Sequence, residues 1–241
     1  MPPDLPPIHE IWVYLAGSPL LALTVTLGAY ALGTTVYERT ARHPLANPVL
    51  IAVATVSLVL VAIDMPYDTY IEGAQFVHFL LGTATVSLAI PIYKGWASLK
   101  GRVGVLLLAL IAGATTSIVT AVGVLQLAGA DEALALGMVA KSVTAPIAMG
   151  VAEQIQASPT LTAVFAVSTG ILGAMLGRFV LNATRVKPWW QRGFALGVAS
   201  HGIGTSRAFS IHPQAGAYAS LGMGLHGVLG AVLIPMLMAW V

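Results

Sequence analysis

The sequence predicts an all-α fold, a polytopic bundle of membrane helices in which two segments are broken or re-entrant. Hydrophobic residues make up 57% of the 241 positions and charged residues only 8%, and the mean hydropathy is +0.87. Soluble domains carry about a quarter charged residues, so this chain cannot form an ordinary aqueous surface. We therefore treat residues 1–241 as a single transmembrane domain, with an irregular lead-in over residues 1–15.

Composition also excludes several classes of function. Eleven Lys and Arg against nine Asp and Glu give a net charge of +2, with no basic run that would suit a nucleic acid. The absence of Cys excludes disulfides, thiolate nucleophiles and Cys-based metal sites. No hydrolase, metalloprotease or nucleotide-binding motif is present, so we expect neither an enzyme nor a cofactor nor a metal. The first ten residues contain no Lys or Arg, which argues against a cleaved signal peptide.

Eight apolar segments follow one another along the chain. A helix needs about 20 residues to cross the ~30 Å hydrocarbon core of a bilayer. Most segments have this character, whereas the fifth and the seventh contain charged residues or many glycines and do not resemble ordinary spans. The eight segments are 18–36, 48–63, 75–93, 103–127, 134–152, 161–181, 193–211 and 215–240.

The charges in the connections are segregated by sign. Acidic connections carry Asp64, Asp68 and Glu72, and then Asp131 and Glu132. Basic connections carry Arg39 and Arg42, then Lys94, Lys100 and Arg102, and then Arg185, Lys187 and Arg192. Basic loops stay in the cytoplasm, which places the N-terminus outside.

The order of these charges constrains the fifth segment. The fourth span ends at the acidic, outer side, and the sixth must begin there if its basic exit is cytoplasmic. The fifth segment, which carries Lys141 and Pro146, must then enter and leave on the outer side as a broken or re-entrant element. We extend this hypothesis to the Gly-rich seventh segment, from the cytoplasmic side. The motif Thr85-Val86-Ser87 followed by Pro91 is similar to the motif Ser142-Val143-Thr144 followed by Pro146. This short similarity leaves open whether the chain contains an inverted repeat.

Lys141 is the strongest candidate for a functional residue. A lysine near the bilayer centre costs at least ~2.5–3.5 kcal/mol, so it must face water, a partner or a ligand. Ser142 and Thr144 add hydroxyl groups, and Pro146 removes a backbone donor. These residues predict a binding site for an anion. The alternatives are a lysine that reaches the membrane surface from a tilted helix, or one paired with Glu153.

The second candidate region is the stretch 197–208, in which three glycines within eight residues oppose an uninterrupted helix. Irregular backbone survives in a membrane only where protein or an aqueous cavity surrounds it. Arg207 has a forked guanidinium suited to a carboxylate or phosphate. An unperturbed histidine titrates near neutral pH, so His201 is a candidate carrier of a coupling proton. The alternative is a short loop with Arg207 at the headgroups. The candidate ligands here are His201, Gly202, Gly204, Thr205 and Arg207.

Five secondary candidates are weaker, and Pro146 is one of them. Thr83 and Thr85 could line a cavity with Ser87 and Pro91, or could only bond helix carbonyls. Glu153 could bind a coupling cation, pair with Lys141 or be solvated. His226 lies in the last span among glycines that favour close helix packing.

Four blocks of the sequence resemble the LrgB/CidB family of antiholin-like, murein-hydrolase-regulating membrane proteins. They are LLGTATVSLAIPIYKG at 80–95, AKSVTAPIAM at 140–149, ALGVASHGIGTSRAFSI at 195–211 and GAYASLGMGLHGVLGAVLIPML at 216–237, and the resemblance extends from about residue 20 to the end. The family pattern tends to Pro at 83, 140 and 178, Thr at 145 and Asn at 226. This chain departs from it with Thr83, Ala140, Arg178, Ala145 and His226.

The family includes plastidial glycolate/glycerate transporters, so the resemblance implies export or exchange of small monocarboxylates such as glycolate, glycerate or pyruvate. It also implies the inner membrane of a cell, and in bacteria a companion of the LrgA/CidA type. We expect contacts with lipid and a homo-oligomer. Our leading prediction is a secondary transporter with alternating access, in which Lys141 and Arg207 hold the carboxylate and Ser142, Thr144 and Thr205 hydrogen-bond it. The alternatives are a holin-like or antiholin-like pore or regulator of murein hydrolase release and lysis, and an assembly partner without transport of its own.

Overall fold

The structure is a computed structural model that describes residues 19–87, 90, 93 and 101–239. Within these ranges the chain is helical and contains no strand, which confirms the all-α prediction. The residues group into two compact units, Met1–Thr85 and Val86–Val241, which are described separately below. The lead-in 1–15 lies outside the described residues, and the single transmembrane domain stays a prediction.

The first unit contains helices α2 (Pro19–Arg39), α3 (Pro48–Ala62) and α4 (Tyr67–Gly73), and the beginning of α5 (Gln75–Ser87). The helix α3 begins after Asn47, whose side chain accepts hydrogen bonds from two backbone N–H groups of the first turn. α3 and α4 are bent by 119°. Thr26 in α2 and Tyr70 in α4 share a hydrogen bond of 2.6 Å, so α4 folds back against α2. The second predicted segment, 48–63, thus corresponds to α3, the first helix of a bent pair.

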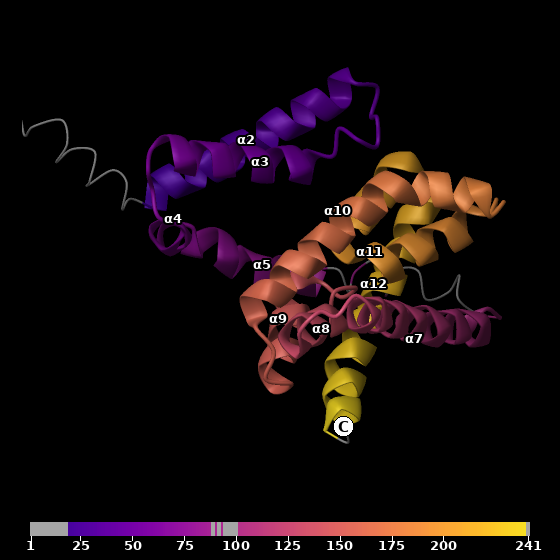
Figure 1. Ribbon diagram of the computed structural model, residues 1–241. Coiled ribbons are helices and arrows are strands. Elements are labelled where there is room, and N and C mark those ends of the chain that lie inside the picture. The colour runs from indigo at the N-terminus through magenta and orange to yellow at the C-terminus, as the bar shows by residue number, and fades with distance from the viewer. Residues whose placement is uncertain (1–18, 88–89, 91–92, 94–100, 240–241) are drawn as a thin grey trace, which may run out of the picture. The chain divides into compact units, whose positions relative to one another are not determined.

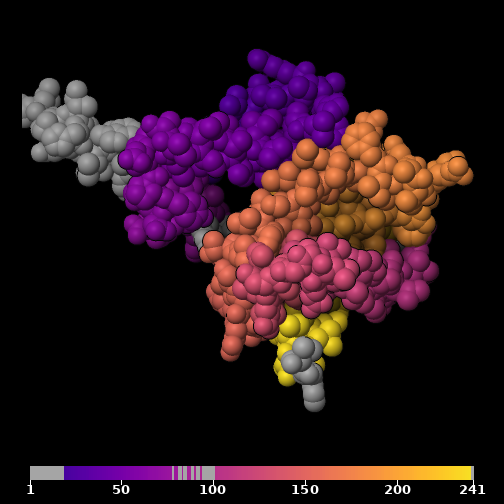
Figure 2. Space-filling view, in the orientation of Figure 1, coloured from indigo at the N-terminus to yellow at the C-terminus, as the bar shows by residue number. Residues whose placement is uncertain are grey.

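The second unit contains the remaining helices (Figure 1). Three of its helices, together with α2 of the first unit, are long and apolar enough to cross a membrane, which confirms a polytopic membrane protein. Figure 2 shows α7 and α10 at the surface of this unit, whereas most of α11 is covered in that view. The helices are α7 (Val103–Leu127), α8 (Glu132–Val139), α9 (Ala145–Gln154), α10 (Pro159–Ala183), α11 (Trp189–Ile211) and α12 (Pro213–Met238).

The helices α8 and α9 form what we call the first hairpin, with its turn at residues 140–144. Gly137 in α8 packs against the side chain of Leu161 in the first turn of α10. Lys141 lines a pocket with Thr169 and Gly173, further along α10. The helix α8 thus runs from the beginning of α10 toward its middle, and α9 returns because four residues separate its end from α10. This is the re-entrant arrangement predicted for the fifth segment.

The turn of the first hairpin lies beside the middle of α7, a helix long and apolar enough to cross a membrane. Lys141 and Ser142 both contact Ser117, ten residues before the end of α7 at Leu127. At 1.5 Å per residue this is about 15 Å, half the thickness of a ~30 Å hydrocarbon core. The first hairpin therefore carries a lysine to mid-depth without crossing the membrane.

The helix α11 is itself a hairpin, which we call the second hairpin. The backbone leaves helical geometry at Ser200 (φ −135°, ψ 16°) and His201 (φ 40°, ψ −129°). The two ends of α11 meet, because the ring of Trp189 stacks on that of His212 with centroids 5.0 Å apart. The break predicted for the seventh segment is therefore present. However, the residue with positive φ is His201, and the glycines have another role.

These glycines allow helices to touch. A Cβ atom at Gly193 or Gly197 would collide with the backbone of α12, at the carbonyl oxygens of Ala215 and Ala219. Gly204 lies against the backbone of Leu196, so it packs the second half of α11 onto the first. Gly193, Gly197 and Gly204 thus have a packing role, because small residues let membrane helices approach closely.

The two hairpins open at opposite ends of the unit. The first hairpin begins and ends beside the acidic connection with Asp131 and Glu132. The second begins after Arg185 and Lys187, at the far end of α10. Their turns approach each other in the middle, where the candidate site lies.

Candidate functional site

The amino group of Lys141 is held by hydroxyl groups. Its Nζ atom donates a hydrogen bond of 2.6 Å to Ser117 Oγ and one of 3.3 Å to Ser142 Oγ, and the two hydroxyl oxygens are 2.6 Å apart. Lys141 is half-buried, and Ser142 is only 5% exposed. Neutral hydroxyl groups orient the ammonium group without neutralising its charge, which leaves the charge available to an anion.

The sequence explains why the hairpin turns here. Thr144 has extended backbone angles and precedes the first residue of α9, and Pro146 lies in the first turn, where no intrahelical N–H bond is lost. Pro146 thus begins a helix and does not kink one. The N-terminus of α9 carries a partial positive charge and lies at the same turn as Lys141, so both favour an anion. The buried Thr144 hydroxyl has no hydrogen-bond partner among the described residues.

A pocket of about 440 Å³, which we call the central pocket, contains Lys141. Its polar lining residues come from three helices and the turn of the first hairpin: Ser117, Thr169 and Ser200, and Lys141. The pocket follows α10 for twelve residues, or about 18 Å, toward the basic end. The remaining lining residues are small or apolar: Leu172, Gly173, Leu176, Gly177, Val180, Leu181, Ala195, Leu196 and Ala199.

The turn of the second hairpin is stabilised by two buried histidines. His201 Nε2 lies 2.8 Å from the carbonyl oxygen of Ala166, and His226 Nδ1 lies 2.7 Å from that of Val198. A carbonyl oxygen only accepts, so each of these nitrogens carries the hydrogen. In an unbroken helix the carbonyl oxygen of Val198 would accept from the backbone N–H group four residues later. The break at His201 separates these two groups, and the ring N–H of His226 donates to Val198 instead. A role for His201 in proton coupling stays a prediction.

The other predicted residues of the second hairpin do not line the central pocket. Thr205 is buried and donates a 2.7 Å hydrogen bond to the carbonyl oxygen of His201. Gly202 has only Met223 within 4 Å of its hypothetical Cβ, and Gly204 packs within the hairpin. Their assignment as substrate ligands stays a prediction.

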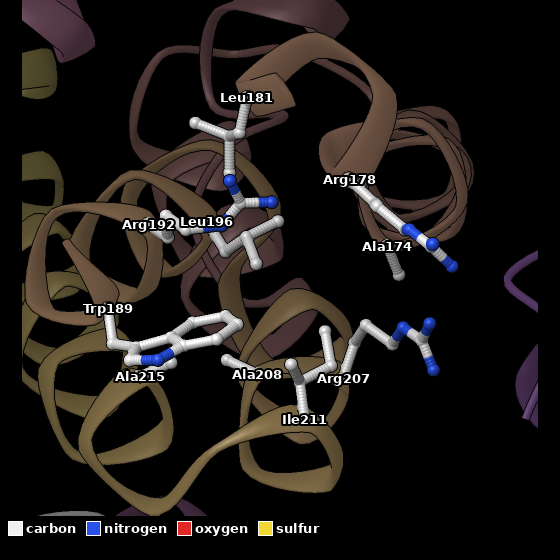
Figure 3. A pocket seen from close by; sticks show the side chains of 10 residues that line it. All are labelled: Ala174, Arg178, Leu181, Trp189, Arg192, Leu196, Arg207, Ala208, Ile211 and Ala215. Atoms are coloured by element: carbon white, nitrogen blue, oxygen red, sulfur yellow. The ribbon is translucent and has the colours of Figure 1, made fainter. Parts of the chain in front are cut away.

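Arg207 lies in a different pocket from Lys141. The second half of α11 returns toward the basic end, and it carries Arg207 to a small pocket shared with Arg178, Arg192 and Trp189 (Figure 3). The structure therefore does not bring Lys141 and Arg207 into one pocket. A joint role for the two in holding a carboxylate stays a prediction.

The secondary candidates are dispersed. Thr83 is exposed and donates to the carbonyl oxygen of Leu80 at 2.8 Å, as the alternative interpretation expected. The side chain of Thr85, and Pro91, lie outside the described residues. Glu153 is exposed in the last turn of α9, at the opposite end of that helix from Lys141.

Sequence reasoning missed Ser117, which makes the shortest contact with Lys141. The only signal was the run Thr115-Thr116-Ser117 in an otherwise apolar span. Such hydroxyl residues usually bond the carbonyls of their own helix, as Thr120 does with Thr116 at 2.6 Å. Only the position of the first hairpin shows that Ser117 serves another element.

Comparison with known proteins identifies the family. The family model described as "LrgB-like family" matches residues 26–240. The chain belongs to the LrgB-like family. "Holin-like protein CidB" of Staphylococcus epidermidis is 29% identical over 93% of this chain and 96% of its own length. The Staphylococcus aureus protein of that name is 28% identical over the same shares.

A third relative, "Uncharacterized protein YxaC" of Bacillus subtilis, is 32% identical over 92% of this chain and 95% of its own length. No solved structure matches the chain. The resemblance to the LrgB/CidB family is thus confirmed. Together with the apolar helices, these relatives identify a multi-pass protein of the bacterial cell membrane.

Proposed function

We propose that this LrgB-like protein is a holin-like protein of the bacterial membrane that lets small anionic solutes cross at the central pocket. In a cell, such permeability would act on murein hydrolase release and lysis. Support comes from the relatives whose printed name is holin-like, none of which is named for a carboxylate. These names favour the holin-like alternative over a monocarboxylate transporter. The main observation in support of a solute path is that the turns of two hairpins, which open at opposite ends of the unit, meet beside Lys141.

The chemistry of the pocket favours anions. Burying an ammonium group in a membrane is costly, and the hydroxyl groups of Ser117 and Ser142 offset part of this cost. The positive charge and the N-terminus of α9 attract an anion and repel cations, as basic residues do in anion-selective pores. A small anion passing Lys141 would exchange its water for these donors and for the hydroxyl of Ser200.

One observation favours a second candidate, a saturable transporter of small monocarboxylates such as glycolate, glycerate or pyruvate. The central pocket extends from Lys141 toward the basic end. Toward the acidic end, the first hairpin is filled by a buried apolar cluster that includes Val139, Val143 and Ala148. Access from one side at a time characterises carriers built from broken helices. In this candidate Lys141 holds the carboxylate, and His201 or Glu153 couples a proton or cation.

The concentration dependence of flux distinguishes the two candidates. The purified chain in liposomes is given labelled glycolate or pyruvate over a wide range of concentrations. A holin-like pore gives flux that rises without saturation and little competition between carboxylates, whereas a carrier saturates and discriminates among them. Flux that appears only when a companion of the LrgA/CidA type is added would instead indicate the third alternative, an assembly partner.

Replacement of the lysine tests the site itself. Lys141→Met should reduce carboxylate flux at least tenfold in a carrier, and should remove the preference for anions over cations in a pore. Lys187→Met removes one positive charge from an exposed connection, and it should leave both the carboxylate flux and the preference for anions unchanged. Unchanged flux and selectivity in a well-folded Lys141→Met protein would contradict the proposed path.

A further inference from the structure

We propose that the central pocket binds aliphatic monocarboxylates with an extended apolar tail, the carboxylate lying at Lys141 and the tail between α10 and α11. This inference names a solute class for the path proposed above, and it therefore rests on that function. The pocket is polar at the end that holds Lys141. All its lining residues within 172–181 and 195–199 are apolar or glycine, and we call this part the apolar arm.

The packing of α11 on α10 determines which residues lie at each end of the pocket. A Cβ atom at Gly173 would collide with the side chain of Ser200, and one at Gly177 would collide with that of Leu196. The part of α11 before Ser200 therefore follows α10 toward the basic end. The hydroxyl of Ser200 thus lies at the same end of the pocket as Lys141, and the apolar arm leads away from both.

The polar end carries a single charge. Among the lining residues that the structure describes, Lys141 alone is charged, and Ser117 orients its ammonium group through the 2.6 Å hydrogen bond. Ammonium and hydroxyl groups can donate hydrogen bonds, and a carboxylate accepts several. One positive charge matches a monoanion, whereas a second negative charge would enter the apolar arm without a partner.

The apolar arm has room for a hydrocarbon chain. Leu172, Leu176 and Val180 line it from α10 and are exposed. From α11 it is lined by Ala195 and Ala199, which are small and also exposed. The pocket volume of about 440 Å³ corresponds to about 15 water molecules at ~30 Å³ each, so a two- or three-carbon acid would fill only a fraction of it.

The charge at the inner end distinguishes this ligand from a membrane phospholipid. A phospholipid acyl chain that entered from the basic end would bring its methyl group to the ammonium group of Lys141, where it offers no hydrogen bond. A single-chain acid such as octanoate places its carboxylate there instead. At ~1.2 Å per bond of an extended chain, its seven C–C bonds span about 8 Å. This reaches from Ser200 to Ala195, five residues earlier in α11 or about 7.5 Å.

Protection of an introduced cysteine tests this proposal without any measurement of transport. The chain has no native Cys, so Ala195→Cys in the full chain in liposomes reports on the apolar arm. Its modification by a small methanethiosulfonate reagent is followed with octanoate, butyrate, glycolate or 1-octanol. Octanoate should protect at a concentration at least tenfold lower than butyrate, because a buried CH₂ contributes ~0.8 kcal/mol, or about fourfold in affinity. Glycolate should not protect, and uncharged 1-octanol should protect at least tenfold more weakly than octanoate.

Two further variants show whether the protection comes from this site. Lys141→Met in the Ala195→Cys chain should raise the octanoate concentration for half-protection at least tenfold. Ala112→Cys is the matched control, at an exposed alanine of α7 outside the pocket, and no carboxylate should protect it. If Ala195→Cys does not fold, Leu176→Cys reports from the α10 side of the apolar arm.

Three results would overturn the proposal. Equal protection by octanoate and butyrate would show that the apolar arm holds no tail. Equal protection by 1-octanol, or no effect of Lys141→Met, would show that the lysine holds no carboxylate. Equal protection of Ala112→Cys would show that octanoate only enters the bilayer.

The same experiments separate this inference from the proposed function. If Lys141→Met changes glycolate flux or anion preference but octanoate does not protect Ala195→Cys, the solute path stands and the tail-binding site is rejected. If octanoate protects but flux and preference are unchanged in Lys141→Met, the binding site stands and the path is rejected.

Discussion

The two hairpins of the second unit reach the middle of the membrane by different physical means. The turn of the first hairpin is held by side chains, since Lys141 and Ser142 bond the hydroxyl of Ser117. The second hairpin is held by close approach of backbones, at Gly193 and Gly197 against α12. The first presents an unneutralised charge, whereas the second supplies a rigid, closely fitted support.

The two hairpins also differ in the space around their glycines. The contacts of the second hairpin leave no room for an added methyl group at Gly193, Gly197 or Gly204. In the first hairpin, Gly150 of α9 has nothing within 4 Å of its hypothetical Cβ. An added methyl group is therefore tolerated at this position of α9, whereas it is not tolerated where the second hairpin touches α12.

The largest effect is expected at Gly197. Gly197→Ala places a methyl group against the carbonyl oxygen of Ala219, a backbone atom that cannot rotate away, so overpacking should cost ~3 kcal/mol or more. Gly150→Ala is the matched variant in the first hairpin, and it should stabilise a helix interior by about 0.5–1 kcal/mol. Unfolding in mixed micelles measures both. Equal effects of the two substitutions would contradict the contrast between the hairpins.

A smaller effect is expected at Ser117. Ser117→Ala removes a hydrogen bond from the ammonium group of Lys141, which should cost about 1.5–3 kcal/mol of unfolding free energy. Ser117→Thr keeps the hydroxyl and should cost less. Thr120→Ala removes an exposed hydroxyl from the same helix and serves as the control. A loss at Thr120 as large as that at Ser117 would mean that Ser117 does not hold the first hairpin.

Charge patterns and rare residues in the sequence predicted part of this arrangement, whereas contacts between distant segments were not predictable from it. The re-entrant first hairpin followed from charge, because the acidic residues before α8 and the basic residues after α10 allow only one crossing between them. Lys141 and Pro146 were visible because each is rare in the middle of an apolar segment. These are local signals that do not require knowledge of which helices touch.

Contacts between distant segments were not predictable in the same way. The packing role of Gly193 and Gly197 is set by α12, whose position no local pattern reveals. Likewise, the second hairpin reverses direction, and this carries Arg207 away from Lys141 to the small pocket that it shares with Arg178 and Arg192. A sequence shows that a helix is broken more readily than it shows the direction in which the chain continues.

The smallest stability effect in this series is expected at His226. His226→Ala leaves the carbonyl oxygen of Val198 without its donor at the break of α11, at a cost of about 1–3 kcal/mol. His226→Asn keeps an amide donor, so most of that loss should be recovered. Thermal unfolding of the two variants measures the difference. If Asn destabilises as much as Ala, the hydrogen bond to Val198 does not stabilise the second hairpin.

Labelling of single introduced cysteines from each side of the membrane tests most directly whether the hairpins enter from opposite sides. The chain has no native Cys, so Ala128→Cys, Gln154→Cys and Lys187→Cys report without background. The first two positions flank the first hairpin, and Lys187 precedes the second. We predict that residues 128 and 154 react from the outer side and residue 187 from the cytoplasmic side. Reaction of residues 128 and 154 from opposite sides would show that α8 and α9 cross the membrane, which would contradict the re-entrant hairpin and the central pocket built on it.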